Sequence, residues 1–183
     1  MVTMMPSKSK AKGNKHEADI SKLFSMWSGK TWHKVPNSGA LRWRGAFWTY
    51  GDVVPPEGIG AVIECKHHEE ISIEDLLGNQ RRKPGEEADI ASWWYDEAVV
   101  DANRCKKELG LTRVEPLLVW KRNFGRNRLC FDMSMLLRLC KKTVLHLGYL
   151  TVDFPELDPF VICDLKDFFE AVPFDLCFPP TDV

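Results

Sequence analysis

The sequence has no apolar run that is long enough to span a bilayer. Its first residues, MVTMMPSKSKAKGNK, are polar and basic and lack the apolar segment of a secretory signal peptide. The six cysteines are scattered without a CxxC pair, which gives little support for a zinc site or a disulfide framework. With 183 residues, 44% of them hydrophobic, the chain is expected to be a cytoplasmic protein with one packed core and no membrane partner.

The chain also has almost no net charge, but its charges are unevenly distributed. Residues 1–50 contain nine lysines and arginines against two acids, whereas residues 151–183 contain one lysine against eight acids. A basic first part suits a polyanion such as nucleic acid, although solvated chain ends often carry charge as well. We expect residues 1–12 to be a disordered basic arm, residues 13–150 to form the main domain, and residues 151–183 to be an acidic extension packed on or beside it.

Apolar periodicity and turn signals predict helices that alternate with strands. The predicted helices cover residues 14–29, 72–77 and 86–109 and a short stretch capped by Ser134. The predicted strands cover residues 46–54, 61–66, 116–122 and 128–133, and the first two form a hairpin. The C-terminal segment holds five of the eleven prolines and is expected to wrap irregularly, with one helix near residues 164–172. This order predicts an α/β fold with a mixed central β-sheet flanked by helices.

One short stretch, AVIECKHHEE at residues 61–70, places Glu64 two positions before Lys66. In a strand these two side chains point to the same face. With 15 lysines and 26 acids in the chain, chance alone yields about two such pairs, and a second copy does occur at residues 164–166 (DLK). That copy lies in the acidic segment, where a site that acts on DNA would be unfavourable, so the first copy is preferred.

Two further acids accompany the first copy. Glu17 continues the apolar stripe of the first predicted helix, and Asp52 lies on the neighbouring arm of the hairpin. Three carboxylates near one ammonium group need a cation, and their hard oxygen atoms suit Mg²⁺ or Mn²⁺. The predicted metal ligands are Glu17, Asp52, Glu64 and the backbone carbonyl of Cys65. Lys66 is expected to position the attacking water or stabilise the transition state of a metal-dependent nuclease.

Each of these residues also has a simpler explanation. Glu17 could belong to a capping box with Asn14, Asp52 could be a turn residue, and Glu64 and Lys66 could form a surface ion pair. Basic side chains elsewhere suit phosphate contacts, with solvated surface as the alternative. The predicted DNA-binding residues are Lys12, Lys15, Lys34, Arg42, Arg44, Lys121, Arg122 and Arg126. The tryptophans at 93 and 94 are expected in the core or in a dimer interface.

The motifs KGNKHEADISKLF (12–24), SGA (38–40), GD (51–52) and VIECK (62–66) resemble those of the PD-(D/E)xK nuclease superfamily. Within it, the chain is most similar to the small Holliday-junction resolvases of archaea and their phage relatives, over residues 12–133. The resemblance implies a restriction-endonuclease-like core, with residues 13–150 as the nuclease domain. It also implies Mg²⁺-dependent hydrolysis of DNA, in recombination or repair, without a small-molecule cofactor. The same resemblance implies a branched DNA substrate and a homodimer. For a phage-encoded protein it also implies a location in the host-cell cytoplasm.

The resemblance also assigns roles to individual residues. Glu17 matches the acid of the family's N-terminal helix, Asp52 matches the motif aspartate, and Ser38 lies where these resolvases carry a serine near the scissile phosphate. Glu64 and Lys66 match the acid and the lysine of the ExK pair, whereas glycine replaces the usual proline before the aspartate. Two other functions stay open: a repair or restriction-type nuclease of this fold that acts on linear or damaged DNA, and a catalytically inactive nucleic-acid-binding module.

Overall fold

A seven-stranded sheet forms the centre of the computed structural model, which describes residues 8–35, 50–69 and 89–178. The strands are β1 (His33–Lys34), β2 (Val53–Val54), β3 (Ala61–His68), β4 (Glu115–Arg122), β5 (Arg128–Asp132), β6 (Tyr149–Val152) and β7 (Phe160–Asp164). They lie in the order β1-β2-β3-β4-β5-β7-β6. β3 and β4 are parallel, and all other neighbouring strands are antiparallel.

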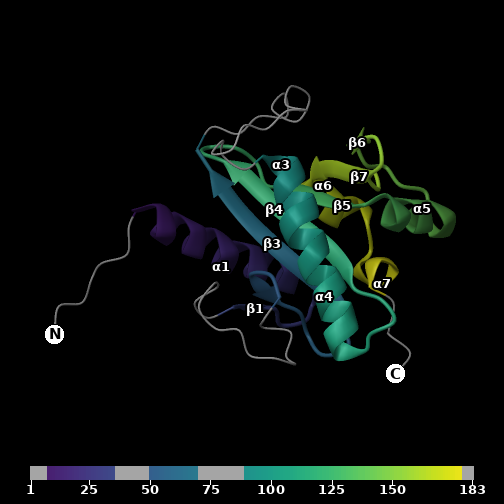
Figure 1. Ribbon diagram of the computed structural model, residues 1–183, viewed down its shortest axis with the longest axis horizontal. Helices are drawn as coiled ribbons and strands as arrows, with labels where there is room; N and C mark the ends of the chain where they lie inside the picture. Colours follow the sequence, from purple (N-terminus) through teal and green to yellow (C-terminus); the bar gives the residue numbers. More distant parts are fainter. Residues whose placement is uncertain (1–7, 36–49, 70–88, 179–183) are drawn as a thin grey trace.

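Helices cover both faces of this sheet (Figure 1). The helices are α1 (Lys8–Ser28), α3 (Ile90–Ser92), η2 (Trp93–Ala98), α4 (Val99–Leu109), α5 (Met133–Lys142), α6 (Leu165–Ala171) and α7 (Phe174–Cys177). α3, the π-helical segment η2 and α4 form one continuous helix, which crosses in front of the sheet in Figure 1. No helix in the described ranges is long and apolar enough to cross a membrane.

Two apolar layers explain why the central strands are buried on both sides. Side chains alternate between the faces of a strand, so Ile63 of β3 packs against α1, whereas Val62 packs toward α4. On β4, Val119 lies on the α1 face and Leu118 lies on the η2 face. Strands that are covered on both faces read as nearly continuous apolar runs. The acidic Glu64 therefore interrupts a buried strand, on the face covered by η2 and α4.

The predicted α/β fold with a mixed central sheet flanked by helices is confirmed, but the first helix starts earlier than predicted. α1 begins at Lys8 rather than near Asn14, so residues 8–12 are helical and are not part of a disordered arm. Lysine and alanine dominate this stretch, and both are good helix formers. Residues 1–7 lie outside the described residues. Because Glu17 is in the middle of α1, the capping-box explanation for it is wrong.

The predicted long helix is confirmed in its described part. The predicted hairpin is confirmed only in part, because residues 50–52 are a bend and only Val53 and Val54 form the strand β2. β2 pairs with β3 through Val53 and Ile63, and the long helix ends at Gly110 with a φ of 66°. α5 is capped by Asp132 rather than by the predicted Ser134, because the Asp132 carboxylate accepts a hydrogen bond from the Ser134 N–H at 2.6 Å. The ranges 46–49, 72–77 and 86–88 lie outside the described residues.

The C-terminal segment contributes the strands β6 and β7 to the central sheet, followed by the helices α6 and α7, which contradicts the irregular wrapping expected for it. β7 pairs with β5 along its whole length, and β6 pairs with β7 at the sheet edge. The predicted boundary at residue 151 falls inside β6. Pro155 and Pro159 lie in the connection between β6 and β7, and Pro173 precedes α7. The prolines therefore mark connections between elements rather than an absence of structure.

Aromatic contacts hold this C-terminal segment on both faces of the sheet. Trp27 of α1 stacks on Phe169 with ring centroids 4.5 Å apart, and its indole N–H donates to the Val172 carbonyl at 3.0 Å. On the other face, Phe160 of β7 stacks on Trp94 of η2 with centroids 5.3 Å apart. Trp94 is fully buried, which places it in the core. The acidic segment therefore contributes to the stability of the whole domain.

Phe160→Ala is expected to lower the free energy of unfolding by about 3–5 kcal/mol, because it empties a fully buried site beside Trp94. Leu157→Ala, in the same segment but 48% exposed, is the matched control and should change this free energy by less than about 0.5 kcal/mol. Urea denaturation followed by tryptophan fluorescence measures both variants. Similar small effects of the two substitutions would show that the C-terminal strands do not support the core.

Candidate active site

Asp52 lies where β2 meets β3, with a buried side chain. Its backbone N–H donates to the Ile63 carbonyl at 2.8 Å, and its carboxylate accepts a hydrogen bond from the Cys65 N–H at 2.9 Å. The preceding Gly51 has a φ of 68°, and a Cβ atom there would lie 2.5 Å from the Ile63 carbonyl oxygen. Proline cannot adopt this conformation, because its ring fixes φ at about −65°. This explains why glycine stands before the aspartate in this chain.

Glu64 and Lys66 project from the same face of β3, as predicted, and form an ion pair. Glu64 Oε1 lies 2.8 Å from Lys66 Nζ. Lys66 Nζ also lies 2.6 Å from Glu97 Oε2, on η2. The Glu64 side chain is 12% exposed and the Glu97 side chain is 41% exposed. The lysine therefore bridges the buried acid of the sheet and a partly exposed acid on the covering helix.

The sequence-based prediction missed Glu97. The available signal was its position in the long helix after Trp93, Trp94 and Tyr95, since an acid beside two core tryptophans lies close to the sheet surface. Its placement also depends on the π-helical turn of η2, which apolar periodicity does not reveal. Such turns are found frequently at functional sites.

Lys66 alone does not balance the negative charges at this site. Burial, followed by the negative charge of Asp52, raises the pKa of Glu64 to about 8, and the Lys66 ammonium group only partly opposes this shift. Burial lowers the pKa of Lys66, but its contacts with Glu64 and Glu97 outweigh burial and raise it. Lys66 therefore stays protonated, while Glu64 needs either a proton or an additional positive charge.

The groups around Asp52 fit a hard divalent cation. The N–H and C=O of one residue in an extended strand point to the same edge, so the Cys65 carbonyl faces the edge where Asp52 accepts the Cys65 N–H. Asp52, Glu64 and this carbonyl are oxygen donors of the kind that Mg²⁺ and Mn²⁺ prefer. Within residues 8–35, 50–69 and 89–178, no three side chains of histidine, cysteine, aspartate or glutamate converge as ligands of one metal ion. Two side-chain carboxylates and a backbone carbonyl are thus the donors that lie together.

Glu17 approaches β3 from the opposite face. It is buried on α1, and its Oε2 atom forms an ion pair at 3.0 Å with Lys34 Nζ, which also donates to Asn14 Oδ1 at 2.7 Å. After burial, the charges of Asp52, Glu64 and Glu17 raise the pKa of the Cys65 thiol. The charge of Glu17 therefore acts on the same segment of β3, although its closest recorded contact is Lys34.

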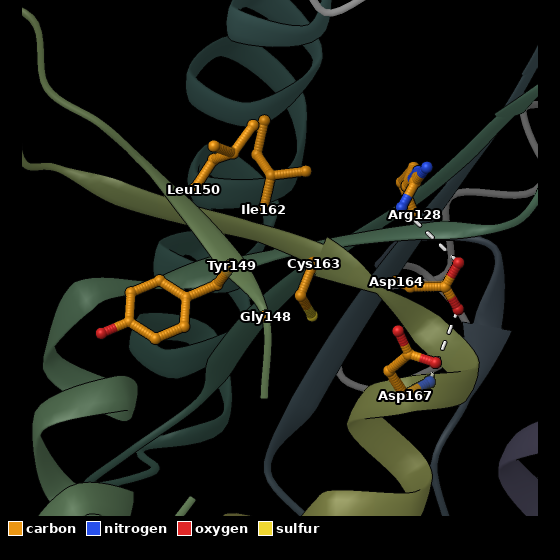
Figure 2. A pocket seen from close by; sticks show the side chains of 8 residues that line it. All are labelled: Arg128, Gly148, Tyr149, Leu150, Ile162, Cys163, Asp164 and Asp167. Atoms are coloured by element: carbon orange, nitrogen blue, oxygen red, sulfur yellow. Dashed lines mark hydrogen bonds and ion pairs between the residues drawn. The ribbon is translucent and has the colours of Figure 1, made fainter. Parts of the chain in front are cut away.

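The second acid–lysine copy does not form a comparable pair. Asp164 ends β7 and caps α6, accepting a hydrogen bond from the Lys166 N–H at 3.0 Å. The Lys166 side chain is 81% exposed and pairs with Glu170. Asp164 lines a pocket of about 230 Å³ beside Arg128, at 3.5 Å from this guanidinium (Figure 2). The pocket contains none of the predicted site residues, and Asp164 serves as a helix cap at the end of a regular strand.

The predicted DNA-binding residues occupy different environments. Lys15, Arg122 and Arg126 are exposed, Lys12 pairs with Glu69 at 2.7 Å, and Lys121 is half-buried. Lys34 faces Glu17, as described above. The predicted residues Ser38, Arg42 and Arg44 lie outside the described residues.

Comparison with known proteins finds one family to which most of the chain is similar. A family model described as "Phage putative PDDEXK endonuclease" matches residues 8–174. No curated protein and no solved structure matches the chain significantly. The match confirms the resemblance to the PD-(D/E)xK superfamily and extends it from residue 133 through β7 and α6.

Glu64→Gln is expected to remove a pH dependence of stability from the metal-free protein. The folded-state pKa of about 8 lies above the ordinary 4.5, so the contribution of Glu64 is fully present below pH 4.5 and is lost as the pH rises to about 8. In this window the wild type should lose up to about 1.4 kcal/mol per pH unit relative to the variant. Urea denaturation in a chelator between pH 5 and pH 8, chosen to span this window, measures the difference. Parallel pH profiles would mean that the pKa of Glu64 is not raised in the folded protein.

Proposed function

The chain belongs to the family described as phage putative PDDEXK endonuclease, and on this basis we propose that it is a Mg²⁺-dependent endonuclease that cuts branched DNA, such as a Holliday junction. The observation that carries the proposal is the buried pair of carboxylates, Asp52 and Glu64, next to a protonated lysine. A structural ion pair would need one acid for one base. The additional negative charge is the feature that a divalent cation would neutralise.

In this proposal the chain positions substrate and water, and Mg²⁺ or Mn²⁺ supplies Lewis acidity and a more acidic bound water. Asp52, Glu64 and the Cys65 carbonyl hold the cation at the β2–β3 edge. Lys66 directs its ammonium group at the attacking water or at the charge that develops on the phosphate. Glu97, 2.6 Å from Lys66 Nζ, would keep this lysine charged and oriented while Glu64 serves as a ligand.

Glu17 and Ser38 are proposed as supporting residues. Glu17 would contribute negative charge from α1, where it holds Lys34 in an ion pair at 3.0 Å. Ser38 contacts the scissile phosphate in the role that the resemblance implies. Lys12, Lys15, Lys34, Arg42, Arg44, Lys121, Arg122 and Arg126 are proposed to contact DNA phosphates.

The branched substrate and the homodimer rest on the similarity of the motif residues to those of Holliday-junction resolvases. Two active sites in a dimer can cut two strands at symmetric positions across a junction. Action in recombination or repair within the cytoplasm of a phage-infected host is part of the same proposal.

We expect Mg²⁺-dependent cleavage of a synthetic four-way junction, with weaker cleavage of the duplexes that form its arms. Lys66→Ala should reduce the single-turnover rate roughly 10²- to 10³-fold, because it removes the charge that stabilises the transition state. Glu97→Gln should cause a smaller loss, roughly 10-fold, since an amide oxygen at this position can still accept a hydrogen bond from the lysine. Gel analysis of end-labelled strands measures both rates and the positions of the nicks.

Lys166→Ala is the matched control, because this lysine also follows an acid by two residues but lies in solvent. It should keep the rate within about two-fold of the wild type. Absence of divalent-dependent cleavage on junction and duplex alike would contradict the nuclease proposal. Equal cleavage of junction and duplex would support the nuclease activity and contradict the preference for branched DNA.

A further inference from the structure

The turn between β4 and β5 carries a side chain that the core does not use. Phe124 is fully exposed, and its φ of 58° lies in the left-handed region that bulky residues rarely adopt. Burial of a phenylalanine is normally favourable, and glycine or asparagine would suit this backbone better. A large aromatic ring held in solvent on a strained turn therefore points to a contact made outside the described residues.

The surroundings of Phe124 are cationic. Residues 121–128 (KRNFGRNR) contain four cations and no acid. Arg122 is exposed, and the Arg126 side chain is 78% exposed. Two acids are recorded against this turn: Glu69 accepts a hydrogen bond from the Asn123 side chain, and Asp164 lies 3.9 Å from Arg126 and 3.5 Å from Arg128. Phe124 thus lies between Arg122 and Arg126, two exposed cations that a polyanion can reach.

The turn is attached to the strand that carries the candidate active site. The Asn123 N–H donates to the His68 carbonyl at 3.2 Å, and Asn123 Oδ1 lies 3.1 Å from His67 Nε2. The Gly125 N–H donates to the Arg122 carbonyl at 3.0 Å and closes the turn. His68 lies about 7 Å beyond Lys66 along β3, the length of two residues of strand. Phe124 is therefore held within a few nucleotides' reach of the proposed cleavage site.

We propose that Phe124 stacks on a DNA base at a point where base stacking is interrupted, while Arg122 and Arg126 bind the flanking phosphates. Platforms for unpaired bases combine an aromatic ring with cations that bind the backbone, and this turn presents that combination. A continuous duplex offers no free base face, so the contact favours branched DNA. The inference rests on the proposed function and adds a residue that selects the structure of the substrate.

The test uses the full-length protein with Ca²⁺, a four-way junction containing 2-aminopurine at the crossover, and a duplex of the same sequence. Phe124→Ala is expected to weaken junction binding roughly 10-fold and to abolish the change in 2-aminopurine fluorescence, with less than about two-fold effect on the duplex. Phe124→Trp should preserve both signals. Val144→Ala, another exposed apolar residue beside two lysines, is the matched control and should change neither.

Phe124→Gly separates binding from folding. It relieves the backbone strain, so its melting temperature should equal or exceed that of the wild type while junction binding is lost as in the alanine variant. Phe124→Ala binding within two-fold of the wild type, or equal weakening on junction and duplex, would overturn the inference. If the wild type cleaves no DNA with Mg²⁺ but Phe124→Ala still loses junction binding, the proposed function is overturned and this inference is supported. If Phe124→Ala binds and cleaves junctions as well as the wild type, this inference is overturned and the proposed function is supported.

Discussion

The burial of the Glu64 carboxylate beside Asp52 is the constraint on which the site depends. A carboxylate in the middle of a buried strand is destabilised in its charged form, and a second carboxylate next to it adds repulsion. Lys66 supplies one positive charge and shares it with Glu97. This arrangement is costly as a stabilising element of the fold, but it is suited to binding a divalent cation.

The scaffold keeps these charges together by backbone interactions. The left-handed turn at Gly51 lets Asp52 approach β3, where its carboxylate binds the Cys65 N–H. On the other side, β4 runs parallel to β3 and ends at Arg122, opposite His68. The site and the basic β4–β5 turn consequently lie at the same end of the sheet, and the strands from the C-terminal segment extend the sheet on the far side.

The sequence was sufficient to predict the elements whose signals are local. The apolar run before Glu64 and the long helix that ends at Gly110 appear where they were expected. The described part of the first hairpin strand is shorter than expected, because Asp52 lies in a bend before β2. The C-terminal strands were missed because prolines and acids suggested irregular structure. Their apolar residues gain stability only from pairing with β5, which is distant in the sequence.

The residues of the candidate site were likewise predictable only in part. Strand alternation correctly predicted that Glu64 and Lys66 share a face, and the hairpin placed Asp52 nearby. The partner of Lys66, Glu97, comes from a helix segment whose π-helical geometry has no simple sequence pattern. The same limit applies to Glu17, because its ion pair with Lys34 depends on how α1 packs against β1 and β3.

The central claim is that Asp52 and Glu64 share a divalent cation in place of a proton. Calorimetric titration with Mn²⁺ at pH 7, repeated in buffers that differ in ionisation enthalpy, counts the protons released on binding. Because the pKa of Glu64 is about 8 without the cation, binding should release close to one proton. Glu64→Gln should abolish this release and weaken binding. Binding of Mn²⁺ without proton release, or unchanged binding by Glu64→Gln, would contradict the account.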